Sequence, residues 1–369
     1  MAACATLGSA GARSVDGSEH ELLIVRRGRR TGVHTIVAVH STVLGPALGG
    51  CRMWRHPSLE DAIDDALRLS RAMTLKAAAA QLSLGGGKSV IWAPAGPAPA
   101  GAFREQLLHD FADTLNMLGG LYITAEDVGT TADDMSALAG DSPYVVGRPT
   151  QSGGGGDPGD FTAAGVVAAM RACCERRFGS SDLSGRSVSI VGLGHVGEPL
   201  ARRLSRCGAS LVLSDIDQAR RSVAGELEAC WLESQDALRA DVDILAPCAL
   251  GGVLDEAVTD ELRCAVVCGA ANNQLTSDEV ADRLAARGIL YAPDFIVNSG
   301  GLINVALELT GYDRELALDR ADDIQSVLAG ILARAEQAAV TPLAAALALA
   351  SERLMAAKAR GRQPVAVPE

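Results

Sequence analysis

A glycine-rich turn between a strand and a helix is the feature that most constrains how this chain folds. The apolar run Ser187–Val191 has the pattern of a buried strand, and Gly192-Leu193-Gly194-His195-Val196-Gly197 follows it directly and opens a helical stretch. Glycines at these spacings let the backbone approach a pyrophosphate group, which then lies at the helix N-terminus. The turn predicts a dinucleotide-binding site at residues 192–197. A similar turn that holds no ligand is the alternative.

An acidic residue follows the next strand. The run Ser210–Ser214 has the pattern of a strand, and Asp215 comes 18 residues after Gly197. A carboxylate at this point accepts hydrogen bonds from the adenosine ribose and repels a 2′-phosphate. The pattern therefore favours NAD over NADP. Arg220 and Arg221 are the alternative, since arginines can bind a 2′-phosphate, but they lie beyond Asp215.

Strands and helices alternate along the second half of the chain. Helical stretches separate the expected strands, which are Ser187–Val191, Ser210–Ser214, Asp243–Pro247, Ala265–Gly269 and Leu290–Ala292. This alternation predicts a doubly wound, mostly parallel sheet, the Rossmann arrangement. Because 369 residues exceed a usual single domain, we expect an α/β protein of two domains.

The first part of the chain predicts a separate α/β domain at residues 1–150, in which residues 1–18 form a loose tail. Its expected strands are Glu21–Arg27, Val33–Thr42, Ser89–Ala93 and Leu121–Ala125, and its expected helices are 58–74 and 102–118. Residues 147–160 include four consecutive glycines, which is typical of a hinge or a ligand-binding loop. The dinucleotide domain is expected at 151–339. A last helix, which starts at Thr341-Pro342 and ends near Arg360, is expected in segment 340–369.

Two lysines and a carboxylate are the candidate reactive groups. The run Gly85-Gly86-Gly87-Lys88 predicts a glycine turn that presents a lysine; it is no phosphate loop, because position 82 is Leu where that motif needs Gly. A lysine buried between domains loses its proton readily and can act as a base. Lys76 follows a helix among small apolar residues, and Glu126-Asp127 follows a strand. Together they would bind an amino-acid carboxylate and move protons at its α-carbon. An ordinary surface charge is the alternative for each residue.

Composition excludes several other classes of protein. A net charge of −12 argues against nucleic acid and anionic membranes as partners, and no apolar run reaches the length of a membrane span. Nine cysteines without a CxxC pair, and six histidines without ligand spacing, argue against disulfides and a metal site. We therefore expect a cytoplasmic enzyme that uses no metal and acts on a small molecule.

Eight segments, in order over residues 20–360, carry a resemblance to one family. They are Gly45–Met53, Met73–Lys76, Gly85–Ile91, Tyr122–Thr131, Gly192–Gly197, Ala246–Gly252, Cys268–Leu275 and Tyr291–Val305. With them the chain resembles the glutamate/leucine/phenylalanine/valine dehydrogenase superfamily, in particular its leucine, valine and phenylalanine branch. The resemblance implies NAD-dependent, reversible oxidative deamination of an L-amino acid to a 2-oxo acid and ammonia. It also implies a homo-oligomer.

The resemblance further implies roles for the matching residues. Lys88 would activate water for attack on the iminium carbon, and Asp127 would exchange protons with the amine. Lys76 would hold the substrate carboxylate, and the backbone at Gly49-Gly50 would line the reacting centre. The family fold implies a cleft that closes between the domains, with the C-terminal helix returning to the first domain.

Further matching positions concern the cofactor. Asn272 and Asn298 would lie at the nicotinamide and the substrate, and Thr162 would contact the nicotinamide carboxamide. Two positions depart from the family pattern: Cys51 replaces a Thr, and Gly159-Asp160-Phe161 replaces a stretch with smaller residues or Pro. Neither belongs to the proton-transfer residues, so both bear on the shape of the pocket.

The substrate side chain is expected among Leu48, Ala125, Leu302 and Val305, by the same resemblance. All four are apolar, whereas a glutamate enzyme would need a cation for the second carboxylate. The bulk of Leu48 and Leu302 favours leucine, valine or isoleucine as substrate. Phenylalanine is the alternative substrate, because the sequence of Met73–Lys76 is more similar to that of the phenylalanine enzymes.

Two other functions stay open at this point. One is a relative that binds NAD without catalysis, although the joint presence of Lys76, Lys88 and Asp127 argues against it. The other is a 2-hydroxy-acid dehydrogenase, which usually needs a histidine as acid and base. His195 lies inside the glycine turn and does not suit that role.

Overall fold

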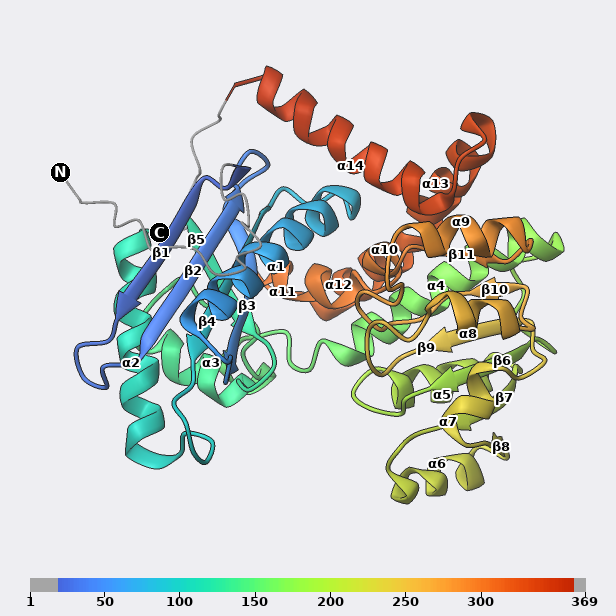
Figure 1. Cartoon of the computed structure of the whole chain (residues 1–369), viewed down its shortest axis with the longest axis horizontal. Helices are drawn as coiled ribbons and strands as arrows, with labels where there is room; N and C mark the ends of the chain where they lie inside the picture. Colours follow the sequence, from blue (N-terminus) through green and yellow to red (C-terminus); the bar gives the residue numbers. More distant parts are fainter. Residues whose placement is uncertain (1–18, 362–369) are drawn as a thin grey trace.

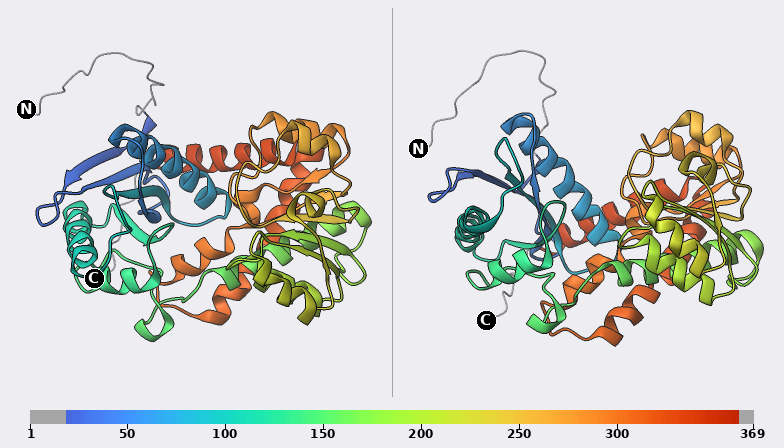
Figure 2. Two further views of the ribbon diagram at one scale, coloured as in Figure 1. Left: turned by 60° about the horizontal axis from the view of Figure 1, so that its bottom comes forward. Right: turned by 90° about the horizontal axis from the view of Figure 1, so that it is seen from below.

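The chain forms two lobes, each built around its own sheet (Figures 1 and 2). The computed structural model describes residues 19–361, so the tail predicted at residues 1–18 and the last eight residues lie outside the described part. One sheet belongs to the N-terminal part of the chain and the other to the C-terminal part. The α/β architecture predicted from the sequence is confirmed.

The first sheet has five strands in the order β1-β2-β4-β3-β5. Their bounds are β1 Leu22–Arg27, β2 His34–Ser41, β3 Ala47–Trp54, β4 Gly85–Trp92 and β5 Tyr122–Glu126. Strand β3 runs parallel to both of its neighbours, β4 and β5. Strand β3 has no recognisable strand pattern in the sequence and was not predicted. Gly85–Gly87 were expected to form a turn, but these glycines are the first residues of β4.

Helices cover both faces of this sheet. Their bounds are α1 Leu59–Ala79, α2 Gly101–Leu118 and α3 Ala132–Ala139. Alternate residues of β2 face opposite ways: Ile36 packs in a core with α1, and Val37 packs in a core with α2. The expected helix start at Ser58 is confirmed, since its side chain accepts a hydrogen bond from the Asp61 N–H. The helix continues to Ala79, so Lys76 lies in its last turn and not after it.

The second sheet has six parallel strands in the order β11-β10-β9-β6-β7-β8. Their bounds are β6 Ser187–Val191, β7 Ser210–Ser214, β8 Cys230–Trp231, β9 Ile244–Pro247, β10 Val266–Val267 and β11 Leu290–Tyr291. The strand order reverses between β6 and β9, which is the point where doubly wound sheets bind their ligands. The last two strands are shorter than the sequence pattern predicts.

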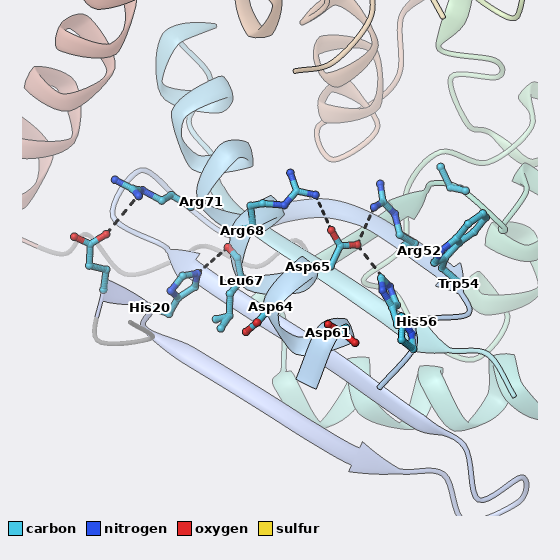
Figure 3. A pocket seen from close by; sticks show the side chains of 13 residues that line it. His20, Arg52, Trp54, His56, Asp61, Asp64, Asp65, Leu67, Arg68 and Arg71 are labelled. Atoms are coloured by element: carbon cyan, nitrogen blue, oxygen red, sulfur yellow. Dashed lines mark hydrogen bonds and ion pairs between the residues drawn. The ribbon is translucent and has the colours of Figure 1, made fainter. Parts of the chain in front are cut away.

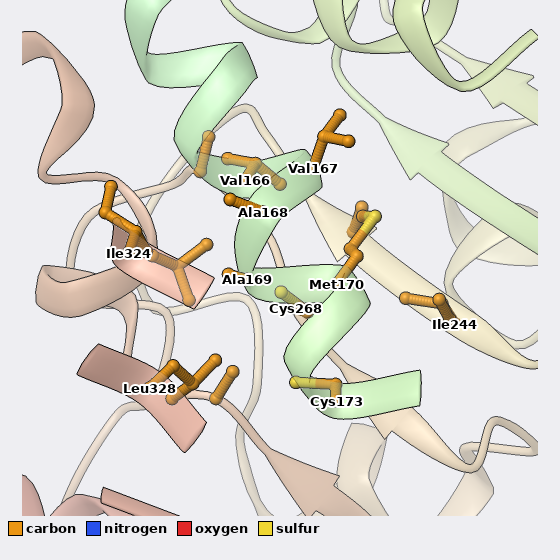
Figure 4. Close-up of a cluster of buried hydrophobic side chains, with 14 of the residues drawn as sticks. Val166, Val167, Ala168, Ala169, Met170, Cys173, Ile244, Cys268, Ile324 and Leu328 are labelled. Atoms are coloured by element: carbon orange, nitrogen blue, oxygen red, sulfur yellow. The ribbon is translucent and has the colours of Figure 1, made fainter. Parts of the chain in front are cut away.

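The helices of the second part include one, α4, that is buried over most of its length. Their bounds are α4 Gly159–Phe178, α5 Gly197–Arg206, α6 Arg221–Glu226, α7 Ser234–Leu238, α8 Glu256–Glu261, α9 Glu279–Ala286, α10 Asp294–Val297, α11 Gly300–Leu307, α12 Arg314–Asp322, α13 Ile324–Ala338 and α14 Pro342–Ala359. Helix α4 is buried in the largest core, where Val166 and Met170 pack with Ile244 of the sheet and Leu328 of α13 (Figure 4).

Helix α14 returns to the first lobe, as predicted. Thr341 caps it by accepting a hydrogen bond from the Ala344 N–H. It packs along α1, and Arg353 donates hydrogen bonds to the carbonyls of Ala77 (3.4 Å) and Ala78 (2.8 Å). In the described part of the chain no single helix is long and apolar enough to cross a membrane. The helices over Arg314–Ala338 pass that test only jointly with α14, across a 107° bend.

Candidate active site

Lys88 and Asp127 form an ion pair at the centre of the first sheet. The Lys88 Nζ lies 2.8 Å from Asp127 Oδ2. Lys88 belongs to β4, Asp127 directly follows β5, and β3 runs between these two strands. A Cβ on Gly50 of β3 would lie 3.2 Å from the Lys88 Nζ and 2.7 Å from the Asp127 Cβ. Glycine at position 50 therefore leaves open the space beside the ion pair.

Close packing explains the other glycines around Lys88. A Cβ on Gly49 would lie 1.8 Å from the Gly87 carbonyl oxygen, and one on Gly86 would lie 2.1 Å from the backbone N of Thr74 in α1. A Cβ on Gly87 would meet the Tyr122 ring at 2.5 Å. These glycines thus let β3, β4 and α1 approach one another closely, which fixes the strand position from which Lys88 projects.

Burial and charge set the ionisation of this pair. Lys88 is only 5% exposed, and burial lowers the pKa of its amine, an effect that Asp127 partly offsets. Burial alone would raise the pKa of Asp127, but the positive charges of Lys88 and Arg52 hold that pKa below its usual value. The result is a carboxylate that stays ionised beside an amine that gives up its proton more easily than a surface lysine.

Lys76 lies near this pair as an unpartnered cation. No carboxylate among the described residues lies within ion-pair distance of its amine, although Asp294 acts on it at longer range. Burial, together with the charge of Lys88, lowers the pKa of Lys76 to about 8, although Asp294 partly offsets this effect. An unpaired lysine in such surroundings suits an anionic group of a small ligand.

The four predicted pocket residues meet in one apolar cluster. Leu48, Ala125, Leu302 and Val305 are all buried and pack together with Ile123 and Leu84. Leu48 and Ala125 come from β3 and β5 of the first sheet, whereas Leu302 and Val305 come from α11. The cluster therefore joins the two lobes beside the lysines.

The glycine turn has the geometry of a dinucleotide site. A Cβ on Gly192 would lie 2.7 Å from the Ala249 side chain, and one on Gly197 would lie 1.8 Å from the Gly192 carbonyl oxygen. A Cβ on Gly194 would have no protein atom within 4 Å. The first and third glycines thus serve protein packing, while the second leaves an open cradle for a group outside the protein. The chain fits a bound dinucleotide here.

Asp215 is held directly over this turn. Its Oδ2 accepts a hydrogen bond from the Leu193 N–H (2.6 Å), and its Oδ1 accepts one from the Asp217 N–H (2.8 Å). The carboxylate is therefore fixed at the end of β7, with lone pairs left for further donors. Arg220, the alternative anion partner, donates to Glu198 Oε2 at 2.8 Å.

Asn298 and Asn272 form a contact at the end of the second sheet. The Asn298 Nδ2 donates to Asn272 Oδ1 (2.8 Å) and to the Ala270 carbonyl (3.0 Å). The Asn298 Oδ1 is buried and has no hydrogen-bond partner in the described part of the chain. A buried acceptor without a donor points to a ligand that supplies one. Thr162, in the first turn of α4, donates to the Pro158 carbonyl (2.9 Å).

The two departures from the family pattern have packing explanations. A Cβ on Gly159 would lie 2.2 Å from the His195 carbonyl oxygen, so glycine lets α4 contact the dinucleotide turn. Asp160 pairs with Arg203 (2.7 Å) and Arg314 (3.0 Å). Cys51 is fully buried behind Lys88, and burial raises the pKa of its thiol to about 12. His195 is exposed and contacts Asp157, and it takes part in no hydrogen bond or ion pair with Lys88 or Asp127.

Sequence reasoning missed Arg52, whose Nε donates to Asp127 Oδ2 at 2.9 Å. The amino-acid composition of the chain also indicates this site, through the scarcity of lysine. The chain has thirty arginines and only three lysines, Lys76, Lys88 and Lys358, so two of its three lysines lie at this site. Where arginine is the usual cation, lysine marks positions that need an amine able to lose its proton.

One lobe has the fold and the glycine turn of a dinucleotide-binding domain, and the other lobe holds a buried lysine–carboxylate pair. Together these features define the chain as a pyridine-nucleotide dehydrogenase. Comparison with known proteins specifies the class. Residues 22–143 match the family model "Glu/Leu/Phe/Val dehydrogenase, dimerisation domain", and residues 212–361 match "Glutamate/Leucine/Phenylalanine/Valine dehydrogenase". The chain belongs to this family and is an amino-acid dehydrogenase, as the resemblance predicted.

Individual relatives cover almost the whole chain. It is 40% identical to leucine dehydrogenase of Bacillus subtilis (strain 168), over 91% of this chain and 92% of that protein. It is 41% identical to valine dehydrogenase of Streptomyces virginiae, over 93% and 96%. Among solved structures, L-tryptophan dehydrogenase from Nostoc punctiforme superposes with a TM-score of 0.81 at 37% identity, covering 94% of this chain and 99% of that one.

Proposed function

We propose that this enzyme catalyses the NAD-dependent, reversible oxidative deamination of an apolar L-amino acid, with leucine, valine and isoleucine favoured. The observation that carries the proposal is the Lys88–Asp127 pair beside the unpaired Lys76 and the apolar cluster. These three features match the amine, carboxylate and side chain of such a substrate.

In this proposal the Lys76 amine binds the substrate carboxylate. Asp127 accepts a proton from the substrate amine, because Lys88 and Arg52 keep its carboxylate ionised. Bound NAD supplies the hydride acceptor. Lys88 in its neutral form then takes a proton from the water that attacks the iminium carbon, which opens the C=N double bond to an amine. Asp127 returns its proton to this nitrogen, and the C–N bond breaks to release ammonia while the new hydroxyl gives its proton to Asp127 and becomes the carbonyl of the 2-oxo acid. The backbone at Gly49-Gly50 lines the reacting centre.

Two exposed apolar side chains support the dinucleotide part of the proposal. Ile216 is 91% exposed and directly follows Asp215, and Leu250 is 75% exposed in the loop after β9. Exposed apolar groups at the ends of two strands beside the turn suit a ligand that covers them. We assign the turn Gly192–Gly197 to the pyrophosphate and Asp215 to the adenosine ribose. Thr162, Asn272 and Asn298 are assigned to the nicotinamide end.

The variant Gly194→Ala is expected to weaken NADH binding roughly tenfold or more, about 1.4 kcal/mol per tenfold, without lowering the thermal unfolding midpoint. The reason is that the added methyl group meets no protein atom and occupies only the cradle. Fluorescence titration with NADH and a melting curve measure both quantities. Gly330→Ala, on α13 with equally open surroundings, is the matched control and should bind normally. Unchanged NADH affinity in Gly194→Ala would contradict the assignment.

The composition of the apolar cluster supports an aliphatic substrate. None of its members carries a charge that would pair with the second carboxylate of glutamate. The relatives named above are 37–41% identical to this chain, and their names give leucine, valine or tryptophan as substrate. An aromatic substrate therefore stays the alternative, because one of these relatives is a tryptophan dehydrogenase. The side-chain volume of Leu48 and Leu302 is the reason that we place aliphatic substrates first.

Leu302→Ala is expected to shift the ratio of kcat/KM values toward phenylalanine, by roughly 10-fold or more, from a wild type that prefers aliphatic substrates. An aliphatic side chain loses packing contacts, whereas a ring gains room. The cluster members Leu84 and Ile123 also border a cavity of about 460 Å³, so the enlarged pocket has space behind it.

Steady-state kinetics with L-leucine, L-valine and L-phenylalanine measure this shift. Leu316→Ala, on the neighbouring helix α12 and outside both the cluster and this cavity, should leave the ratio unchanged. A wild-type enzyme that already prefers phenylalanine would refute the pocket assignment while leaving the reaction class intact.

One assay tests the reaction itself. NADH formation is measured across a panel of L-amino acids and L-2-hydroxy acids, with NAD and NADP in parallel. Turnover of apolar amino acids alone supports the proposal. Turnover of hydroxy acids, or tight NADH binding without any turnover, would support one of the two other functions considered above.

We also propose that the enzyme is a cytoplasmic homo-oligomer. The N-terminal match is to a model described as a dimerisation domain. Strand β1 lies at the edge of the first sheet and exposes Leu23 and Val25, which suits a contact between subunits. Light scattering on the purified protein tests this, and a monomer at micromolar concentration would contradict it.

A further inference from the structure

Arg52 is a second cation in contact with the reactive pair. Strands β3 and β5 pair with Cys51 opposite Glu126, so Arg52 lies beside Asp127. The Arg52 Nε donates to Asp127 Oδ2 at 2.9 Å, and the Lys88 Nζ lies 2.8 Å from that same oxygen. The other oxygen, Oδ1, takes part in no hydrogen bond or ion pair with any described residue. Two cations therefore hold one oxygen and leave the other free.

A second carboxylate holds Arg52 in place. The Arg52 Nη1 donates to Asp65 Oδ2 of α1 at 2.8 Å. Asp65 is in turn held through its Oδ1 by Arg68 Nη2 (2.7 Å), and the His56 Nε2 lies 3.6 Å from its Oδ2 (Figure 3). These groups line a surface hollow of about 1060 Å³, so the chain of contacts runs from solvent to Asp127.

We propose that Arg52, held by Asp65, is a positioning residue of this enzyme: it fixes the Asp127 carboxylate so that Oδ1 faces the substrate amine. A lysine alone cannot fix the rotation of a carboxylate, because an ammonium group is a single point of charge on a flexible stem. The planar guanidinium bonds Asp127 and Asp65 through two different nitrogens, which fixes its plane. The inference rests on the proposed deamination and adds a residue to its machinery.

The charge of Arg52 has a second consequence. In addition to each other, the titratable groups that act on Lys88 or Asp127 are Arg52 and Cys51 from β3, Tyr122 from β5 and Lys76 from α1. Arg52 lowers the pKa of Asp127 and also that of Lys88. Without Arg52, the Asp127 charge would act on Lys88 alone. Both pKa values are then expected to rise.

The test compares Arg52→Gln, Arg52→Lys and Asp65→Asn with the wild type over a range of pH. In Arg52→Gln we expect kcat to fall roughly 10–100-fold, with a much smaller change in the KM of the amino acid. We expect the acid limb of the pH profile of kcat/KM to shift to higher pH by about one unit. Arg52→Lys should restore the pH profile but not the full kcat. Asp65→Asn should give a smaller loss of kcat.

Arg71→Gln is the matched control, since Arg71 also lies on α1 and lines the same hollow but contacts neither Asp65 nor Asp127. It should behave as the wild type. A purely structural role of Arg52 would lower the unfolding midpoint without moving the pH profile. A wild-type kcat and pH profile in Arg52→Gln would overturn the proposal, and so would the same losses in Arg71→Gln.

The small number of lysines allows a direct measurement without turnover. Incorporation of lysine labelled with ¹³C at Cε gives three resonances, from Lys76, Lys88 and Lys358. The titration midpoint of Lys88 should rise in Arg52→Gln, because the charge of Arg52 lowers the pKa of Lys88 in the wild type. An unchanged Lys88 midpoint would count against the proposal. A wild type that oxidises no amino acid would refute the proposed function instead, so the two failures are distinguishable.

Discussion

Lys88→Ala is expected to lower kcat for amino-acid oxidation by roughly 10²–10⁴-fold, the usual contribution of a general base. Lys88 is the amine at this site that is paired directly with Asp127, and it lies beside the space that Gly50 leaves open. Asp127 keeps its bond to Arg52 in the variant, so the carboxylate does not become an unpaired buried charge. We therefore expect the fold to survive and the chemistry to fail.

Steady-state rates and a calorimetric NADH titration on the same preparation separate these effects. NADH affinity should stay near that of the wild type, because the glycine turn belongs to the other sheet. Lys358→Ala, which removes a lysine of α14, is the control and should keep its activity. Near-normal turnover by Lys88→Ala would mean that another group acts as the base.

A preference for NAD over NADP of roughly 10²–10³-fold in kcat/KM is the second large effect. A carboxylate and a phosphate charge about 4 Å apart repel each other by about 4 kcal/mol at an effective dielectric constant near 20, which is about 10³-fold. Asp215 is partly exposed, so the lower end of this range allows for screening by solvent. Two backbone N–H groups fix its carboxylate, which prevents the side chain from turning away.

Asp215→Asn should narrow this preference, because it removes the charge and keeps an oxygen for the Leu193 N–H. Asp217→Asn, at an exposed neighbouring carboxylate, should not change the preference. Equal kcat/KM values for NAD and NADP in the wild type would refute the assignment. Such a result would direct attention to Arg220, which Glu198 holds, or to the exposed Arg221.

Local pattern was sufficient to predict much of the second lobe. The apolar runs of β6 and β7, and the glycines between β6 and α5, carry their structural signal within a few residues. Strand β3 had no such signal, since its sequence Ala-Leu-Gly-Gly-Cys-Arg-Met-Trp contains two glycines and no β-branched residue. The strand exists because its neighbours supply close backbone contacts, and those contacts depend on long-range packing.

The candidate site shows the same limit. Lys88, Lys76 and Asp127 were predicted because glycines, small residues and a strand end mark them in the sequence. Arg52 was not, because its importance comes from the pairing of β3 with β5 and from Asp65 on a helix. Lys88 itself was expected in a turn, since three consecutive glycines more often end a strand than begin one. The roles of these residues remain proposals.

The return of α14 to α1 determines how the two lobes can move. The chain passes from the first lobe to the second through residues 147–158, and α14 then packs back on α1 without a covalent link, so one chain crossing and one packing contact join the lobes. A body attached at two separate points loses most of its freedom to translate or twist and keeps mainly rotation about the line through those points. The anchoring bonds of Arg353 lie on the last turn of α1, next to Lys76. The axis of such a rotation would therefore pass close to Lys76, the lysine proposed to bind the substrate carboxylate, and this end of the site would move least.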